Sequence, residues 1–463
     1  MGILGVVSSS LGITEDGLLL LFSLLAGYPA AFAYRKLEIY KQSTTVQYSY
    51  FTLVGFALMV ISYGWNVYHS LLSILAAYLI CKFVPGTRLS AILAYGGFFG
   101  HLMVAYWFHE SDKYDVTYTT PQCILSMRLV GLVMDVYDGR QKEESLRKEQ
   151  REHRIQDSPS LLEVAAFSYF YGSFLVGPQF PLVRLRSLVN GEFLDNGKLR
   201  DCGTLPLSNV LAALVYIGVF QVGLYVMPES YLVSARFLEL PFVAKQFWVA
   251  YWFYYNMCKY KVAWLLAEGS CMLTTIAFNG RDEKTGEERW DGTRDFDIRG
   301  FELGYTCQSM IDNFNRNTSL WTKRHVYVRL IFLGNKLASQ AITLLFLACW
   351  HGYHLGYFCL FAFEFGSMQV ETQLALVVER VPALRETFSR HFWLKWLIGK
   401  TLLVLGTSFA YLGFGLIKTH RWFNVKLSMY FYVYVVTILW MVLFPYVIKP
   451  RLPKKEDDAK KTT

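Results

Sequence analysis

Long hydrophobic runs are the dominant pattern along the chain. One covers residues 17–34 without a charged residue, and the next covers 42–81 with no charged residue apart from His69. About 20 apolar residues span a bilayer as a helix, so the second run is long enough for two spans that turn near 64–66. Further runs cover residues 89–108, 161–177, 205–228, 238–257, 262–279, 331–349, 354–368, 396–417 and 427–448. The pattern predicts an all-α polytopic membrane protein with about ten to twelve membrane helices.

Charged residues at the ends of the first run predict how the chain is oriented. Glu15 and Asp16 precede the run, and Arg35 and Lys36 follow it directly. The run lacks the basic segment that begins a cleaved signal peptide, so we expect it to be retained as a span. The positive-inside tendency then places the N-terminus in the lumen and residues 35–41 in the cytosol.

The C-terminal end of the chain is basic and hydrophilic. We expect residues 1–448 to form a single membrane-embedded domain and residues 449–463 to form a cytosolic tail. Lys460 and Lys461 occupy the fourth and third positions from the end. This pair resembles the dilysine retrieval signal of endoplasmic-reticulum membrane proteins, which predicts a multi-pass protein of that membrane.

The overall composition agrees with a membrane protein. Hydrophobic residues make up 54% of the chain and charged residues 17%, and the mean hydropathy is +0.28. These values differ from those of a soluble enzyme. The net charge of +9 is small for 463 residues and lies in loops and the tail, so nucleic acid is not an expected partner. The eight cysteines include no C-x-x-C pair, so neither a zinc site nor a disulfide framework is indicated.

Polar residues also occur between and within the apolar runs. The segments 138–160 and 280–299 are hydrophilic, and we interpret the first as a surface helix or a plain connector and the second as a loop. Arg128 and Asp135 are seven residues apart, on one helix face, where a buried ion pair or another structural contact is favoured over catalysis. Asn317 begins a glycosylation sequon, which we expect to be unused because of its basic neighbours.

One histidine lies inside strongly apolar sequence. His351 follows a hydrophobic run, and an ionisable group at membrane depth is costly and usually functional. Gly352 and Gly356 are four residues apart, which predicts a helix face open to another backbone or a ligand. A neutral imidazole can take a proton from a hydroxyl near neutral pH. A packing role for this histidine is equally open at this point.

An asparagine-rich segment precedes this histidine by a long stretch of chain. Asn315 is 36 residues before His351, and a straight helix of that length would measure ~54 Å, against a hydrocarbon core of ~30 Å. The two residues can therefore meet only if the chain reverses, for which residues 333–336 are the expected pivot. An amide side chain can donate to a developing oxyanion or orient a hydroxyl. Asparagines in a polar segment are also common as caps and turns.

Several short motifs around these two residues resemble a known family. They are Phe314-Asn315, Trp321, Arg324-His325, Trp350-His351-Gly352 and Gly356-Tyr357. Their order and spacing resemble the paired Asn and His motifs of the membrane-bound O-acyltransferase family. The stretches 127–139, 171–180 and 278–280 are similar to one branch, the lysophosphatidylcholine acyltransferases of the third type. The resemblance covers about residues 120–380.

The resemblance implies a fold and a reaction. The membrane helices of this fold would enclose a central chamber. Acyl-CoA would enter the chamber from the cytosol, and a lysophospholipid would enter it from the bilayer. His351 would deprotonate the sn-2 hydroxyl of the lysophospholipid, and Asn315 would position the reacting oxygens. Lysophosphatidylcholine would be the preferred acceptor, with the ethanolamine and serine lysolipids also accepted. Acyl-CoA is then a co-substrate, and neither a cofactor nor a metal is implied.

Other residues near the motifs are candidates for binding. Trp321 and Trp350 would wall the chamber, although tryptophan also serves as an ordinary core or interface anchor. His354 would lie beside His351. A basic cluster would attract the CoA phosphates to a cytosolic mouth, or it would simply reflect positive-inside topology. The cluster consists of Lys323, Arg324, Arg329 and Lys336.

Other functions fit parts of the pattern. A transporter of a lipid or small molecule also has many spans with a few buried polar groups, but such proteins often contain internal repeats, and we find none. A membrane di-metal oxidase needs several clustered histidine ligands, and only His351 and His354 are close together in the sequence. The His-x4-Asp motif of soluble-type glycerolipid acyltransferases does not occur in the chain.

Overall fold

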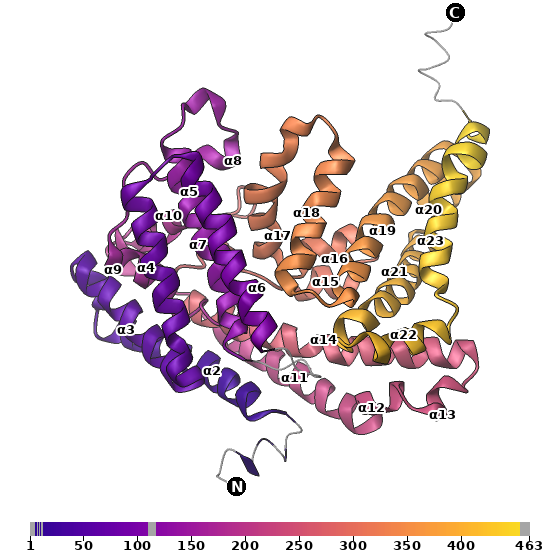
Figure 1. Cartoon of the computed structure of the whole chain (residues 1–463), viewed down its shortest axis with the longest axis horizontal. Helices are drawn as coiled ribbons and strands as arrows, with labels where there is room; N and C mark the ends of the chain where they lie inside the picture. Colours follow the sequence, from indigo (N-terminus) through magenta and orange to yellow (C-terminus); the bar gives the residue numbers. More distant parts are fainter. Residues whose placement is uncertain (1–4, 7, 9, 11–12, 110–116, 454–463) are drawn as a thin grey trace, which may run out of the picture. The chain divides into compact units, whose positions relative to one another are not determined.

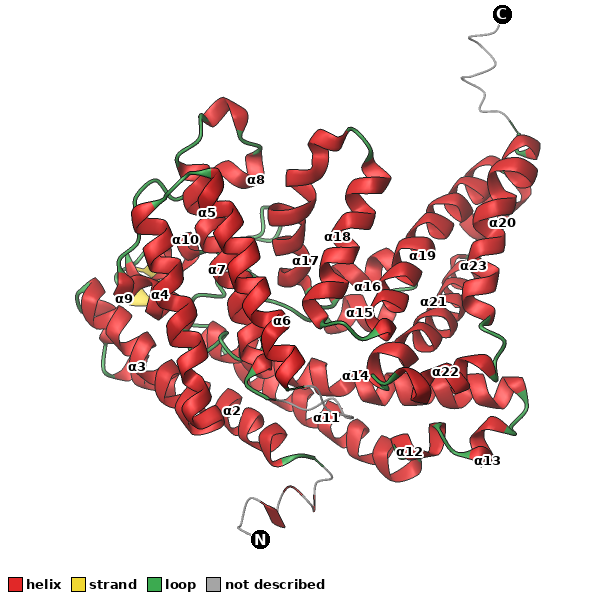
Figure 2. Cartoon of the chain, viewed as in Figure 1, coloured by secondary structure: helices red, strands yellow, loops and turns green. Residues whose placement is uncertain are grey.

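Helices make up nearly all of the regular structure. The computed structural model describes residues 5, 6, 8, 10, 13–109 and 117–453, so Lys460 and Lys461 of the dilysine pair lie outside the described residues. Strand structure among the described residues is minor and includes a short antiparallel hairpin (Figure 2), formed by β1 (Leu194–Asp195) and β2 (Lys198–Leu199). The predicted all-α fold class is confirmed.

Six helical segments of the described chain are long and apolar enough to cross a membrane. They are Glu15–Lys36, Thr44–Phe83, Arg88–Phe108, Leu205–Val226, Phe392–Gly415 and Tyr432–Arg451. The second has 40 residues and breaks at a 3-10 turn, Gly64–Asn66, where Gly64 has a φ of 56°. This break is the turn that the sequence predicted. The full count of about ten to twelve membrane helices stays a prediction.

The chain forms two compact units, each assembled from separate stretches of sequence. The first comprises Met1–Val222, Met257–Phe296 and Asn315–Phe332, and the second comprises Gly223–Asn256, Asp297–Phe314 and Leu333–Thr463. Two helices, α11 (Leu205–Val226) and α14 (Phe242–Leu273), continue from one unit into the other. The expectation of a single membrane domain stays a prediction.

The first unit contains the N-terminal helices and the segment that follows Asn315 (Figure 1). Besides the hairpin β1–β2, its elements are α2 (Glu15–Lys36), η1 (Ile39–Lys41), α3 (Thr44–Tyr63), η2 (Gly64–Asn66), α4 (Val67–Phe83), α5 (Arg88–Ile92), η3 (Leu93–Phe98), α6 (Phe99–Phe108), α7 (Thr119–Gly139), η4 (Glu143–Ser145), α8 (Lys148–Arg151), α9 (Leu161–Ser168), α10 (Leu182–Val189), α17 (Arg316–Thr322), η5 (Lys323–Tyr327) and η6 (Val328–Leu333). Helix α7 packs against α4, α5, α6 and α9 and is buried over almost its whole length.

Arg128, in the middle of α7, joins this buried helix to the end of α9 and to the chain that follows α9. Its guanidinium donates to the carbonyls of Phe167, Ser173 and Pro178 at 3.0–3.3 Å. The same group lies over the rings of Phe167 and Phe180, with about 5 Å to each ring centroid. The sequence analysis expected a buried structural contact for Arg128, and this network is one. Asp135 is not its partner.

The second unit is built around α19. Its elements are α12 (Glu229–Leu232), α13 (Ala235–Leu238), α15 (Ile298–Leu303), α16 (Cys307–Asn313), α18 (Lys336–His351), α19 (Leu355–Arg380), α20 (Pro382–Arg390), α21 (Phe392–Gly415), α22 (Thr419–Leu427), α23 (Tyr432–Leu443), η7 (Phe444–Ile448) and η8 (Lys449–Arg451). Helix α19 packs against α18, α21 and α23. A Cβ at Gly356 of α19 would overlap the carbonyl of Gly413 of α21, so the two backbones touch there.

Helix α14 differs from the sequence expectation. The apolar runs 238–257 and 262–279 were predicted as separate segments, but residues 242–273 form one continuous helix of 32 residues. The polar residues between the runs do not end the helix, because Lys261 is fully buried with its ammonium over the rings of Tyr216 and Phe296. A cation held on aromatic rings is compatible with a helix interior.

Candidate active site

Asn315 lies immediately before helix α17, in the first unit. Its backbone is in the left-handed region, with φ 53° and ψ 44°, which asparagine tolerates better than most residues that have a Cβ. Its carbonyl accepts a hydrogen bond from the amide of Ser319 at 3.1 Å, the first of the helix. The side chain is half-buried, and its amide group forms no hydrogen bond within the described residues. The amide group is thus available to a ligand.

The turn at Asn315 is held by Asp295, a residue of the hydrophilic loop before α15. The amide of Arg316 donates to the Asp295 carbonyl at 3.1 Å. The amide and the side-chain Nδ2 of Asn317 both donate to Asp295 Oδ1, at 3.0 and 2.9 Å. Asn317 Nδ2 also donates to the carbonyl of Arg294 at 3.0 Å. The two residues that follow Asn315 are therefore fixed to one loop.

Trp321 and His325 lie one turn apart along α17 and η5. Their rings are 4.9 Å apart and both are buried. A Cβ at Gly131 of α7 would crowd the indole nitrogen of Trp321, so the glycine lets the indole approach α7 closely. The carbonyl of His325 accepts a hydrogen bond from the hydroxyl of Tyr95. Both η3 and η5 are π-helical turns, which occur frequently at functional sites.

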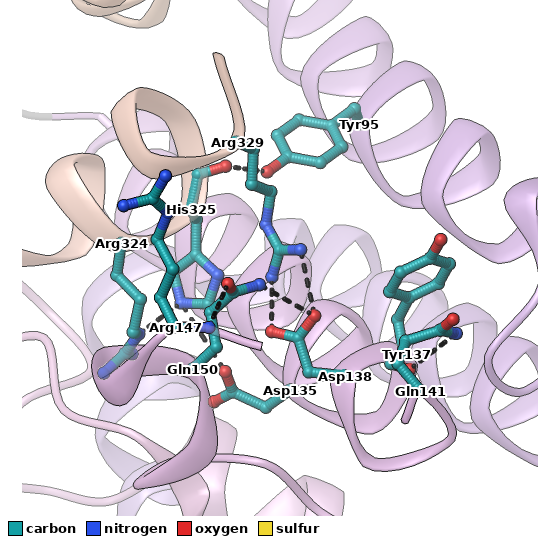
Figure 3. Close-up of polar contacts among 10 residues, drawn as sticks. All are labelled: Tyr95, Asp135, Tyr137, Asp138, Gln141, Arg147, Gln150, Arg324, His325 and Arg329. Carbon is teal, nitrogen blue, oxygen red and sulfur yellow. Dashed lines mark hydrogen bonds and ion pairs between the residues drawn. The ribbon is translucent and has the colours of Figure 1, made fainter. Parts of the chain in front are cut away.

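Arg329 forms a buried ion pair with Asp138, at the end of α7 (Figure 3). Its two terminal nitrogens donate to the two carboxylate oxygens at 3.0 and 2.7 Å. Gln150 Nε2 donates to the same carboxylate at 3.2 Å. The Asp138 side chain is 1% exposed and that of Arg329 is 18% exposed. The charge of Arg329 is thus already neutralised within the fold, although the sequence analysis placed it at a CoA mouth.

A cavity of about 490 Å³ lies in the first unit, beside the start of α17. Its size is within the range of small-molecule sites in proteins, ~300–1,000 Å³. The walls carry three acidic side chains, Glu149, Glu152 and Asp291. They also carry five basic side chains, Arg184, Arg294, Arg316, Lys323 and Arg324. Basic groups therefore exceed acidic groups on the lining, which favours an anionic ligand.

Three of these arginines have no carboxylate partner in the described part of the chain. Arg184 donates to the carbonyls of Ile276 and Phe278, at 2.8 and 2.6 Å. Arg324 Nε donates to His325 Nε2 at 2.9 Å, and Arg316 forms no side-chain ion pair with any described residue. A phosphate in the cavity would give these guanidinium groups a directly bonded anion.

The other two basic side chains of the cavity do have carboxylate partners. Arg294 Nε is 3.0 Å from the buried Glu268. Lys323 is 3.6 Å from Glu149, with both side chains largely exposed. An exposed pair of this kind is worth little, so Lys323 can exchange Glu149 for a ligand phosphate.

His351 is the last residue of α18, in the second unit, and its imidazole is surrounded by aromatic rings. The ring centroids of Trp350, Tyr357, Phe361 and Phe414 lie 4.6, 5.8, 5.6 and 5.0 Å away. These rings come from α18, α19 and α21. No hydrogen bond to the imidazole is found within the described residues, so packing alone orients the ring.

The helix carrying His351 ends where the sequence analysis expected it to continue. Gly352 has a φ of 122° and closes α18, and α19 begins at Leu355. Gly352 and Gly356 therefore do not share a helix face, although Gly356 does contact another backbone as predicted. His354 is the residue before α19, and its ring lies 5.7 Å from that of Tyr357. The physical reason for the break is the left-handed backbone of Gly352, which an α-helix cannot contain.

The predicted site residues fall into two groups. Asn315, Trp321, Lys323, Arg324 and Arg329 belong to the first unit. His351, Trp350, His354 and Lys336 belong to the second, where Trp350 is buried and Lys336 is exposed at the start of α18. Lys323, Arg324 and Trp321 line the cavity. The meeting of Asn315 with His351 stays a prediction.

The sequence analysis missed several residues of the first group. Arg184, Arg294 and Arg316 were not singled out, yet they line the cavity. Asp295 was counted only as part of a hydrophilic loop. No spacing rule connects these positions, since only the folded chain brings them together.

Comparison with known proteins gives a consistent result. The model of the MBOAT, membrane-bound O-acyltransferase family matches residues 103–416. A Caenorhabditis elegans protein named lysophospholipid acyltransferase 5 is 42% identical over 98% of this chain and 97% of its own length. Proteins of the same name from Homo sapiens and Drosophila melanogaster are 34% and 32% identical, over 98% and 96% of this chain and 93% and 90% of their own.

Proposed function

The chain belongs to the membrane-bound O-acyltransferase family, and we propose that it is a lysophospholipid acyltransferase that uses acyl-CoA as its donor. The acceptor is the sn-2 hydroxyl of a lysophospholipid, with lysophosphatidylcholine preferred and the ethanolamine and serine lysolipids also used. The name shared by its relatives supports the acceptor class. The reaction remodels membrane phospholipids.

The cationic cavity is the observation that carries the choice of acyl-CoA. CoA is the strongly anionic partner in this reaction, and Arg184, Arg316 and Arg324 offer guanidinium groups without a carboxylate partner among the described residues. Arginine binds phosphate in a bidentate fashion. The same wall includes Asn317 and Trp321 of the Asn315 segment, so CoA bound there would lie beside the proposed catalytic asparagine.

The chemistry follows from the two proposed catalytic residues. The neutral imidazole of His351 takes the proton of the sn-2 hydroxyl as the oxygen attacks the thioester carbonyl. The side-chain amide of Asn315 donates to the oxygen that gains negative charge. Collapse of the intermediate breaks the carbon–sulfur bond, and the imidazolium returns the proton to the CoA thiolate. The products are a phospholipid and free CoA, with no covalent enzyme intermediate.

The cellular setting is part of the same proposal. The protein is a multi-pass protein of the endoplasmic-reticulum membrane with a lumenal N-terminus and a cytosolic C-terminus. Acyl-CoA arrives from the cytosol, and the lysolipid arrives from the surrounding bilayer. The basic residues that directly follow the first hydrophobic run and the basic C-terminal tail support this orientation.

Release of CoA by the purified protein in detergent tests the proposal. Acyl-CoA with lysophosphatidylcholine should release free thiol, and acyl-CoA alone should release almost none. A lipid transporter would release no thiol, because it moves its substrate without breaking the thioester bond of acyl-CoA. Thiol release that does not depend on the lysolipid would contradict the proposed acceptor.

A further inference from the structure

Asn315 occupies a backbone conformation that must be maintained by its surroundings. A non-glycine residue in the left-handed region persists where neighbouring structure imposes that conformation. The residues after Asn315 are bound to Asp295 by three hydrogen bonds of 2.9–3.1 Å. These bonds fix the direction in which the chain leaves the turn, and hence the direction of the Asn315 side chain.

Asp295 is itself rigidly placed. It is 2% exposed, and a Cβ at Gly177, where φ is +96°, would lie 2.9 Å from Asp295 Oδ2. The carboxylate therefore fills a space that only a glycine leaves open. Asp295 does not line the cavity, whereas Asn317 does. Its effect on the reaction must pass through Asn317 and Arg316.

We propose that Asp295 is a positioning residue that, through Asn317, holds the Asn315 amide in its catalytic orientation; the inference rests on the proposed role of Asn315. Loss of the Asp295 carboxylate lets the turn relax and moves the Asn315 amide away from the developing charge. A displacement of about 1 Å at a catalytic group can cost ~10²-fold in rate. Binding of acyl-CoA, which depends on the arginines of the cavity, is unaffected.

A carboxamide is a good substitute for this carboxylate. Burial raises the pKa of Asp295 to about 6, against the hydrogen bonds from Asn317, which lower it. Replacement of the Asp295 carboxylate by an uncharged group that still accepts hydrogen bonds is therefore a small change. Asp295→Asn keeps an Oδ1 acceptor for Asn317, whereas Asp295→Ala removes it.

Loss of the side-chain donor at Asn317 gives a second test. Asp295 Oδ1 accepts from both the backbone amide and Nδ2 of Asn317, and Nδ2 also donates to the Arg294 carbonyl. Asn317→Asp removes both Nδ2 bonds and places a second carboxylate against Asp295 Oδ1, where two like charges repel each other.

The experiment measures kcat and the acyl-CoA KM of the full-length protein in detergent, with the exposed loop variant Glu283→Gln as control. We expect Asp295→Ala and Asn317→Asp to lower kcat by ~10–100-fold. For Asp295→Ala the KM should stay within about twofold, because Asp295 is outside the cavity. Asp295→Asn should be within about fivefold of wild type in kcat.

Two results would overturn the inference. One is an Asp295→Asn protein no more active than Asp295→Ala, and the other is an Asp295→Ala protein whose folded fraction keeps the wild-type kcat. The proposed chemistry fails separately, if Asn315→Ala keeps the wild-type kcat. That variant is measured in the same series, so the two failures are distinguishable.

Discussion

Arg329→Gln should destabilise the protein without weakening acyl-CoA binding. The substitution removes the cation that pairs with Asp138 at 2.7 and 3.0 Å and leaves the carboxylate buried, with the Gln150 amide still bonded to it. Figure 3 shows that these groups point toward one another at the end of α7. Arg329 is not among the residues of the cavity, so a phosphate in the cavity would not depend on it.

The size of the loss follows from the burial of the pair. The Asp138 side chain is 1% exposed, and removal of one partner of a buried ion pair costs about 3–5 kcal/mol, because an uncompensated charge remains. The cost should be at the lower end of this range, because the Gln150 amide still donates a hydrogen bond to the Asp138 carboxylate. Asp138→Asn/Arg329→Gln leaves no charge in the site and should regain much of this loss.

Thermal unfolding in detergent, followed by the loss of the monodisperse species on size exclusion, measures this effect. Arg329→Gln should unfold several degrees below wild type, and the double variant should unfold between the two. Arg281→Gln is the matched control, because Arg281 forms an exposed pair with Glu288, and such pairs contribute ~0–1 kcal/mol. An unchanged unfolding temperature, together with a raised acyl-CoA KM, would refute the reasoning and return Arg329 to the CoA mouth.

Three further predictions follow from the cavity, the helix contact and the sequon. Arg316→Gln and Arg324→Gln should each raise the acyl-CoA KM by about 10–150-fold, because a charge-assisted hydrogen bond contributes ~1.5–3 kcal/mol; the effect should shrink with added salt, while the lysolipid KM stays near wild type. Gly356→Val should abolish the monodisperse species, because its side chain would overlap the Gly413 backbone; a well-folded variant would contradict the close α19–α21 contact. Asn317 should carry no glycan, since its Nδ2 donates to Asp295 and Arg294; endoglycosidase treatment should leave the electrophoretic mobility of the protein unchanged.

Features encoded by neighbouring residues were predictable from the sequence. One such feature is the break at Gly64–Asn66. Another is the break between η6, which ends at Leu333, and α18, which begins at Lys336. Both breaks follow from local glycine and asparagine positions. Asn335, for example, caps α18 by accepting a hydrogen bond from the Ala338 amide at 3.1 Å. Such signals act within a few residues and need no knowledge of the fold.

Features that depend on distant residues were not predictable. Lys261 looked like an interruption between two apolar runs, because the rings that hold its ammonium belong to Tyr216 and Phe296. Arg329 looked like a free cation, because its partner Asp138 is 191 residues away in the chain. The excess of basic groups in the cavity likewise arises from arginines on separate elements.

The candidate catalytic residues have a different status. Asn315 and His351 were selected by membrane depth, chemistry and resemblance, and the fold gives each a defined setting. Asn315 lies in a left-handed turn beside the cavity, and His351 lies within a group of aromatic rings. Their direct cooperation stays a prediction, which only activity can test.

The most direct test of the central claim is the rate of lysolipid-dependent CoA release by His351→Ala. Loss of a general base typically costs ~10²–10⁴-fold in rate, and we predict a loss of this size with the expression level and size-exclusion profile of wild type. The Arg281→Gln protein, prepared in parallel, should keep the wild-type rate. A rate for His351→Ala within a few-fold of wild type would contradict the account, because it would make His351 a packing residue.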